Sequence, residues 1–160
     1  MDELPEPLVP SYVDLAGYGY MPLYGHRLLG SEFNSLCSDA EWRAGVTLWW
    51  VAWNQRPAAS LPDSDPALAR MAEFGKDVRA WRRVRDHALH GFVKCSDGRL
   101  YHRVLAALAI EAWERRVRDR DRKERWRLSR NADRDVPATG TEHGLNGSKN
   151  VVRDVPGTWS

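Results

Sequence analysis

The fold is decided by residues 78–103, which read VRAWRRVRDHALHGFVKCSDGRLYHR. The first half of this stretch places apolar side chains at helical spacing, on the residues Val78, Trp81, Val84, Ala88 and Leu89. We expect the helix to begin at about Lys76 or Asp77 and to end at His90. Two short β-prone runs then flank Asp97-Gly98, which is the strongest hairpin signal in the chain. The stretch therefore predicts a helix followed by a β-hairpin.

Two further helices are expected upstream of this stretch. Ser38 and Glu41 have the spacing of a capping box, in which each side chain satisfies a free backbone N–H of the first helical turn. The helix that follows carries an apolar face made of Trp42, Val46, Trp49 and Trp53. Gly45 inside this helix predicts that another element approaches closely there. A shorter helix is expected to begin at Asp65-Pro66, with Asp65 as its N-cap.

These elements together indicate a known layout. Three helices followed by a hairpin form a winged helix-turn-helix, with the third helix in the recognition position and the hairpin as the wing. Residues 56–63 contain two prolines and are expected to form a loop. A fourth helix begins at about Val104, and its apolar stripe ends near Trp113. We therefore predict a mainly α fold with a small β-hairpin: a winged helix-turn-helix plus a long C-terminal helix.

Composition sets the expected boundaries. Residues 1–19 mix Pro, Gly and acids and are expected to form a flexible N-terminal arm. Residues 20–113 are expected to form the winged-helix-like domain, with a short strand between Tyr20 and Leu29. Residues 114–130 form a charged helical extension in this scheme. Residues 131–160, with their Gly, Pro, Asn and Thr, are expected to be a disordered tail.

The charge of the chain is unevenly distributed. Its net charge of +2 combines a segment 1–60 with three Arg against seven acids and a segment 61–130 with eighteen Lys and Arg against eleven acids. A basic segment beside an acidic one indicates a surface that faces a polyanion. Nucleic acid is the partner class that this pattern favours.

The sequence also predicts a cytoplasmic protein. Cys37 and Cys95 lack the spacing of a redox or zinc motif, and two isolated thiols suit a reducing compartment. The acidic, Pro-rich N-terminus is unlike a signal peptide. The longest strongly apolar run, from Val46 to Trp53, is too short to cross a bilayer. We therefore expect no membrane partner.

The outward face of the third predicted helix is the candidate binding surface. Arg79, Arg83 and His90 line one side of this helix, and the cations of the hairpin extend the charge. The candidate nucleic-acid contacts are Lys76, Arg79, Arg82, Arg83, His90, Lys94, Arg99 and Arg103. Guanidinium groups suit this role because they reach phosphate and guanine edges with two hydrogen bonds. The alternative is a solvated face whose arginine stems cover Trp81.

Residues 111–130 allow three interpretations. Opposite charges four residues apart let a solvent-exposed helix stand by itself, and they occur at Glu111/Arg115, Glu114/Arg118, Arg115/Asp119, Asp119/Lys123 and Asp121/Arg125. The basic excess also fits an arm that crosses phosphates. Trp126 has no evident core around it, which makes it the candidate partner-binding residue of a helix that docks on another protein.

The sequence contains no recognisable enzyme site. GxSxG, HExxH and phosphate-binding glycine loops are all missing from the chain. His87, His90, Cys95 and His102 are close in sequence, but their spacing matches no standard zinc module. We therefore expect no catalytic residues, no metal, no cofactor and no small-molecule substrate.

Four phrases carry a resemblance to a known family: Met21-Pro22-Leu23, Leu48-Trp49-Trp50-Val51-Ala52-Trp53, Pro57-Ala58-Ala59-Ser60-Leu61-Pro62-Asp63, and Gly91-Phe92-Val93-Lys94-Cys95-Ser96-Asp97-Gly98-Arg99-Leu100-Tyr101-His102. The stretch from about Met21 to Trp113 resembles the prophage-associated domain of unknown function 1376, also called the YdaU-like family. The resemblance implies a phage or prophage protein whose layout is similar to the winged-helix domains of phage replication initiators. It implies no catalytic residues. Arg103 stands where the family pattern has proline, which adds charge to the wing.

The expected function follows from the basic face and the resemblance. We predict a non-enzymatic DNA-binding protein of phage or prophage origin, linked to DNA replication initiation or its regulation, with duplex DNA as the favoured partner. The alternative is a protein–protein interaction adaptor that uses the same scaffold to dock a replication helicase or its loader.

Overall fold

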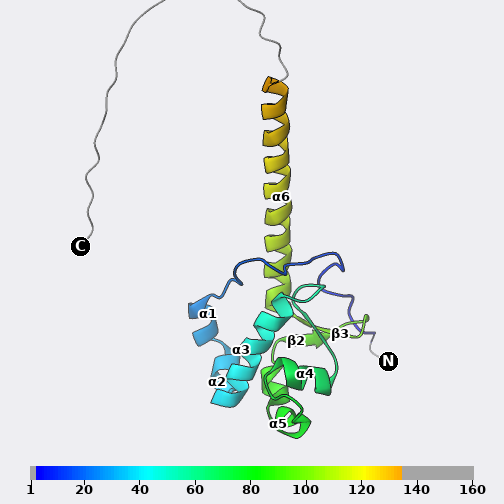
Figure 1. Ribbon diagram of the computed structural model, residues 1–160. Coiled ribbons are helices and arrows are strands. Elements are labelled where there is room, and N and C mark those ends of the chain that lie inside the picture. Colours follow the sequence, from blue (N-terminus) through cyan, green and yellow to red (C-terminus); the bar gives the residue numbers. More distant parts are fainter. Residues whose placement is uncertain (1–2, 135–160) are drawn as a thin grey trace, which may run out of the picture. The chain divides into compact units, whose positions relative to one another are not determined.

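The computed structural model describes residues 3–134. Helices dominate it, as the sequence predicts, and its strands form one small sheet that contains the predicted hairpin (Figure 1). The elements are α1 (Gly25–Leu29), α2 (Glu32–Leu36), α3 (Asp39–Trp53), β1 (Ser60–Pro62), α4 (Asp65–Met71), α5 (Val78–Ala88), β2 (Phe92–Lys94), β3 (Arg99–His102) and α6 (Arg103–Arg134). Within residues 3–134, each helix is too short or too polar to span a membrane.

The three strands form an antiparallel sheet in the order β1-β3-β2. Ser60 of β1 and Val93 of β2 both pair with Tyr101 of the central strand β3. The predicted β2–β3 hairpin is confirmed. The predicted loop over residues 56–63 is wrong in part, because Leu61 is fully buried and its backbone extends the sheet beside β3 as β1.

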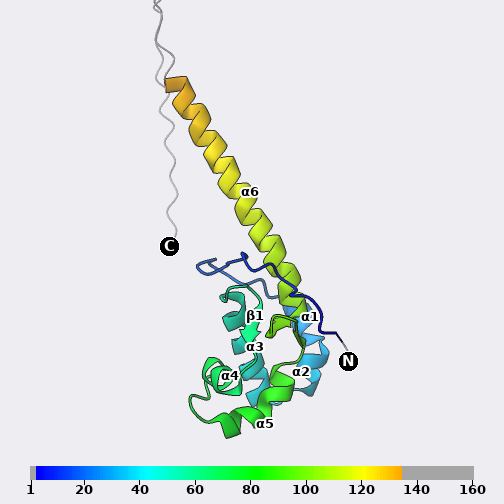
Figure 2. The ribbon, with the colours of Figure 1, turned by 90° about the vertical axis from the view of Figure 1, so that its right-hand side faces the viewer.

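α3 lies between two apolar clusters. On one side, Trp49 and Trp53 pack with Tyr101 and with the first turns of α6. On the other side, Leu48 packs with Trp81 of α5 and with apolar side chains of α4. Both α4 and α5 contact α3, and they lie together beside it (Figure 2). α3 is therefore the element around which the core is built.

The predicted start of α3 and the predicted close approach at Gly45 are confirmed. The backbone N–H of Ser38 donates to Glu41 Oε2 at 2.7 Å, and the Glu41 N–H donates to Ser38 Oγ at 3.4 Å. Phe33 of α2 lies against Gly45, so that a Cβ atom there would come within 2.6 Å of the ring and within 3.2 Å of the Ala88 carbonyl oxygen. Gly45 therefore lets α2 and the end of α5 pack directly on α3.

The N-terminal region departs from the prediction in its secondary structure. A strand was expected between Tyr20 and Leu29, but residues 25–29 form the helix α1. The Tyr24 carbonyl accepts hydrogen bonds from the N–H groups of Arg27 and Leu28 at 3.0 Å each, and Leu28 is buried. A single helical turn buries Leu28 in this way without a partner strand, so the strand prediction is wrong.

Residues 3–18 contain no helix or strand, but part of this segment packs in the core. Val9, Val13 and Leu15 are buried within the cluster around Trp53. Two backbone hydrogen bonds fasten the segment: Ala58 N–H donates to the Val13 carbonyl at 3.0 Å, and Ser96 N–H donates to the Pro5 carbonyl at 2.8 Å. Residues 1–19 are predicted to form a flexible arm, and the packing of Val9, Val13 and Leu15 in the core is not part of that prediction.

α6 begins at Arg103, close to the predicted position. Its apolar stripe packs on the core through the buried residues Leu105, Ala106, Ala109 and Ala112. The chain divides after Lys123 into two compact units, and α6 continues through this point to Arg134. The predicted tail over residues 131–160 therefore begins inside a helix, and its residues 135–160 lie outside the described part of the chain.

Candidate nucleic-acid interface

α5 carries the candidate surface, and its first turn and buried face hold it in place. The Asp77 carboxylate accepts a hydrogen bond from the Ala80 N–H at 2.9 Å and caps the helix. Trp81, Val84 and Ala88 are buried against α3 and α4. The opposite face of α5 is left to polar side chains, as predicted.

Asp63, just before α4, and Asp65, the first residue of α4, bind part of this polar face. Asp65 accepts hydrogen bonds from Trp81 Nε1 at 3.0 Å, Arg82 Nε at 2.8 Å and Arg85 Nε at 2.9 Å. Asp63 pairs with Arg85 at 3.4 Å and with Lys94 Nζ of β2 at 2.9 Å. The hydrogen bond from Arg82, more than any other contact, lowers the pKa of Asp65. We call Asp63, Asp65 and their three cations the Asp63–Asp65 cluster.

The role of Asp65 differs from the one predicted. It was expected to be the N-cap of its helix, but Ser64 holds that position and makes no capping hydrogen bond through its side chain. Asp65 is the first helical residue, and both of its carboxylate oxygens point to donors of α5. The carboxylate therefore joins α4 to α5.

The Asp63–Asp65 cluster divides the predicted contacts into two groups. Arg82 and Lys94 are neutralised within the molecule, together with Arg85, which was not among the predicted contacts. Arg82 nevertheless keeps 64% of its side chain exposed. Only 22% of the side chain of its partner Asp65 is exposed, so the pair is open to water mainly on the arginine side.

Lys76, Arg79 and Arg83 form the second group. All three side chains are exposed, and within the described residues none of them has an ion-pair partner. They lie just before α5 and in its first two turns. We call these three residues the free cations of α5.

The predicted contacts Arg99 and Arg103 of the hairpin differ in their surroundings. The Arg99 Nε donates to Ser60 Oγ of β1 at 2.9 Å, which turns the side chain toward the sheet. His102, at the end of the hairpin, is buried at 7% exposure. Burial, helped by the charge of His90, lowers the pKa of His102 to about 4, so its ring is neutral at pH 7. Arg103 is exposed at the start of α6.

His90 also lies apart from the free cations. It follows the end of α5, is half-buried, and has its Nε2 atom 3.9 Å from a carboxylate oxygen of Glu32. His87 pairs with Glu41 at 2.9 Å. Within residues 3–134, no group of three or more His, Cys, Asp or Glu residues is placed to hold a metal ion.

Trp126, the candidate partner-binding residue, belongs to the second unit of the chain. Its side chain is 58% exposed, and that of Leu128 is 63% exposed. The guanidinium carbon of Arg130 lies 4.8 Å from the centre of the Trp126 ring. The absence of a core around Trp126, which the sequence suggested, is thus observed in the described part of the chain.

The residues that sequence reasoning missed are Asp63, Asp65 and Ser60. Each binds a predicted cation from a distant part of the chain: Asp65 is 17 residues from Arg82, and Ser60 is 39 residues from Arg99. The sequence shows Asp63 and Asp65 as two acidic residues at the start of α4. Their partners depend on how α4 packs on α5, which no local spacing reveals.

Residues 19–111 of the chain match the family model described as "Protein of unknown function (DUF1376)". No curated protein and no solved structure matches the chain. The family match covers α1 to the first turns of α6, and therefore includes the Asp63–Asp65 cluster and the free cations of α5.

Proposed function

The chain belongs to the DUF1376 family of proteins of unknown function, and we propose that it is a non-enzymatic protein that binds duplex DNA through α5. In this proposal α5 enters the major groove, the free cations contact phosphates, and the β2–β3 hairpin lies against the DNA backbone. A cytoplasmic location, a phage or prophage origin and a link to DNA replication belong to the same proposal and rest on the sequence alone.

The order of the elements supports a winged helix-turn-helix. From α3 to β3 the chain runs helix, strand, helix, helix, strand, strand, and β1 pairs with β3 rather than with β2. Winged-helix domains share this order and this sheet. In that arrangement α4 and α5 are the helix-turn-helix pair, and α5 holds the recognition position.

The free cations of α5 carry the proposal. Lys76, Arg79 and Arg83 are exposed without an ion-pair partner among the described residues. Arg82 adds a fourth cation that is exposed and paired with Asp65. A helix in the recognition position that exposes several unpaired cations favours a polyanionic partner.

A gel-shift titration tests the proposal. Arg79→Ala combined with Arg83→Ala should weaken binding to unrelated duplexes by about tenfold or more at low salt, because two phosphate contacts are lost. Arg118→Ala combined with Arg120→Ala removes the same charge from α6 and is the matched control. Equal affinity of both double variants for DNA would exclude α5 as the contact.

A second candidate function is a protein–protein interaction adaptor. The exposed Trp126 and Leu128 favour it, because exposed aromatic and aliphatic side chains of one helix are typical anchors at protein interfaces. In this alternative Trp126→Ala abolishes binding to a purified replication helicase or loader, and that binding persists at salt concentrations that release DNA.

A further inference from the structure

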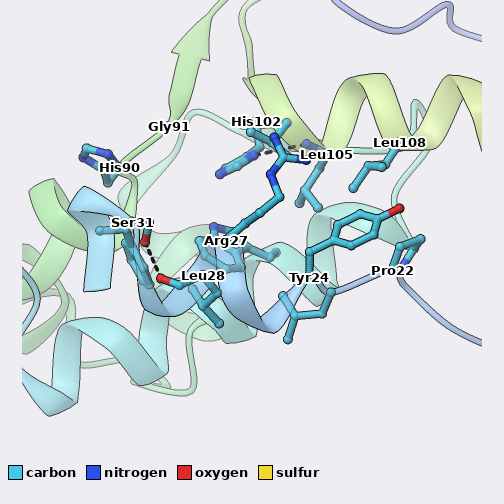
Figure 3. Close-up of a pocket in the computed structure, with 14 residues that line it drawn as sticks. Pro22, Tyr24, Arg27, Leu28, Ser31, His90, Gly91, His102, Leu105 and Leu108 are labelled. Carbon is cyan, nitrogen blue, oxygen red and sulfur yellow. Dashed lines mark hydrogen bonds between the residues drawn. The ribbon is translucent and has the colours of Figure 1, made fainter. Parts of the chain in front are cut away.

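A cavity of about 320 Å³ lies in the first unit, between α1, α2, the start of α6 and the His90–Gly91 turn. Figure 3 shows residues of α1 on one side of it and of α6 on the other. Its walls are mainly apolar and are supplied by Leu23, Leu28, Phe33, Trp49, Leu105 and Leu108. This volume and this lining are typical of small-molecule sites.

His102 presents a polar atom to this cavity. The Leu105 backbone N–H donates to His102 Nδ1 at 3.3 Å, so in the neutral ring Nε2 carries the proton. Figure 3 shows the bonded edge of the ring turned to Leu105, which leaves the Nε2 edge directed away from α6. Within the described residues, Nε2 has no hydrogen-bond partner. In the cavity wall, His102 is therefore an N–H donor without an acceptor among the described residues.

Trp49 lies in the same wall. Its side chain is 7% exposed, and its Nε1 atom is buried without a hydrogen-bond partner. The indole packs between Phe33, with ring centres 4.7 Å apart, and His102, with ring centres 5.3 Å apart. Buried N–H groups without acceptors are rare in proteins because they lose their hydrogen bonds to water. The His102 N–H, which lines the cavity, favours an occupant that brings an acceptor atom.

The charged groups around the cavity favour an anion. Arg27 lines it, and no Asp or Glu is among the lining residues. Glu32, just outside, is 3.9 Å from His90 and too distant for a hydrogen bond. Arg27 is exposed, has no ion pair within the described residues, and extends from α1 toward the side of the cavity that α6 forms (Figure 3).

We propose that this cavity binds a small organic anion with a planar apolar body, such as an aromatic carboxylic acid. The carboxylate pairs with the Arg27 guanidinium, the apolar body packs against Leu28, Phe33 and Leu105, and the His102 N–H binds an acceptor atom. Neutral ligands of the same shape lack the charge that Arg27 recognises. The proposal is independent of DNA binding, because α5 contributes none of these groups.

Titration of the full chain followed by NMR tests the proposal. The probes are 2-naphthoate and its neutral analogue 2-naphthamide, and the readout is the indole N–H signal of Trp49. We expect 2-naphthoate to shift this signal saturably. Arg27→Gln should lower the affinity for 2-naphthoate by about tenfold or more, because a charge-assisted pair is lost. The affinity for 2-naphthamide should stay unchanged. Arg56→Gln, also an exposed arginine but outside the cavity, is the matched control.

Three results would overturn the proposal. The first is that 2-naphthoate leaves the Trp49 signal unchanged up to the solubility limit of the probe. The second is that the acid and the amide bind equally well to the unmodified chain. The third is that Arg27→Gln and Arg56→Gln have the same effect on 2-naphthoate. Arg27 is exposed, so its substitution leaves the fold intact. Each of these outcomes therefore reports on ligand binding and not on misfolding.

Discussion

The indole N–H of Trp81 donates to Oδ1 of Asp65 at 3.0 Å, and through this hydrogen bond α4 and α5 are joined at the protein interior. Trp81 is fully buried, so its N–H has lost access to water. The same carboxylate also binds Arg82 and Arg85. One side chain therefore satisfies a buried donor and restrains two cations of the proposed DNA-binding helix.

Asp65→Ala should lower the free energy of unfolding by about 1–3 kcal/mol, because the buried Trp81 N–H loses its acceptor. Asp65→Asn should cost less, since the amide oxygen still accepts this hydrogen bond. Urea denaturation followed by tryptophan fluorescence measures both. Asp86→Ala is the control, because the Asp86 side chain is 95% exposed and should change stability by at most about 0.5 kcal/mol. If Asp65→Asn and Asp65→Ala lower the free energy of unfolding equally, the charge of Asp65 stabilises the protein more than its hydrogen bond from Trp81.

Asp63→Asn combined with Asp65→Asn should increase the affinity for duplex DNA. The substitutions remove the two acids that neutralise Arg82, Arg85 and Lys94, and each cation that then contacts a phosphate should steepen the salt dependence by about 0.9 in the logarithmic slope. Fluorescence anisotropy at several salt concentrations measures this slope.

The control for this prediction removes two acids that lie outside the cluster. Glu3→Gln combined with Glu6→Gln changes the net charge equally at exposed N-terminal positions. If both double variants show the same increase in affinity and the same salt slope, the effect is one of net charge, and the Asp63–Asp65 cluster does not restrain the DNA contacts.

The stability of the protein should fall as the pH drops from about 6.5 to about 4, because of His102. Its folded-state pKa is lowered to about 4 from an ordinary value of 6.5, so below pH 6.5 the unfolded chain takes up a proton that the folded chain refuses. The contribution of neutral His102 to the free energy of unfolding is fully present above pH 6.5. It is lost as the pH falls through 4, and the total loss is roughly 3 kcal/mol.

Urea denaturation at pH values between 4.5 and 7 checks this prediction, since carboxylates begin to titrate only at the lower end of that window. His102→Gln should remove most of the slope, although the variant is less stable at every pH. His26→Gln, at an exposed histidine, should leave the slope unchanged. A steep slope that survives in the His102 variant would assign the pH dependence to another group.

Gly45→Ala should destabilise the protein by about 1–3 kcal/mol despite the better helix propensity of alanine. The added methyl group would lie 2.6 Å from the Phe33 ring. This ring cannot easily move away, because it packs against Trp49. Thermal unfolding by circular dichroism measures the effect. Gly25→Ala is the control, because a Cβ atom there would have nothing within 4 Å. An unchanged or higher Tm for the Gly45 variant would contradict close packing of α2 on α3.

The sequence predicted those elements whose signals are local. Ser38 and Glu41 are three residues apart and specify the start of α3, and Asp97-Gly98 specifies the hairpin between β2 and β3. Gly45 likewise predicted a close approach, although not that Phe33 is the neighbour. Each of these features depends on residues that are near one another in the chain.

The features that could not be predicted depend on distant partners. β1 contains a proline and only three residues, and it becomes a strand because β3, about forty residues later, pairs with it. The helix α1 replaces a predicted strand because the core accepts Leu28 from a single helical turn. The division of the basic face into restrained and free cations depends on Asp63 and Asp65, whose positions follow from the packing of α4 on α5.

The packed N-terminal segment has a practical consequence for the choice of recombinant fragments. The family match begins at residue 19, yet Val9, Val13 and Leu15 upstream of it are buried around Trp53. A fragment trimmed to the match would leave large aromatic surface open to water and would be prone to aggregate. The smallest fragment that keeps its core begins before Pro5, so the folding unit extends beyond the segment that defines the family.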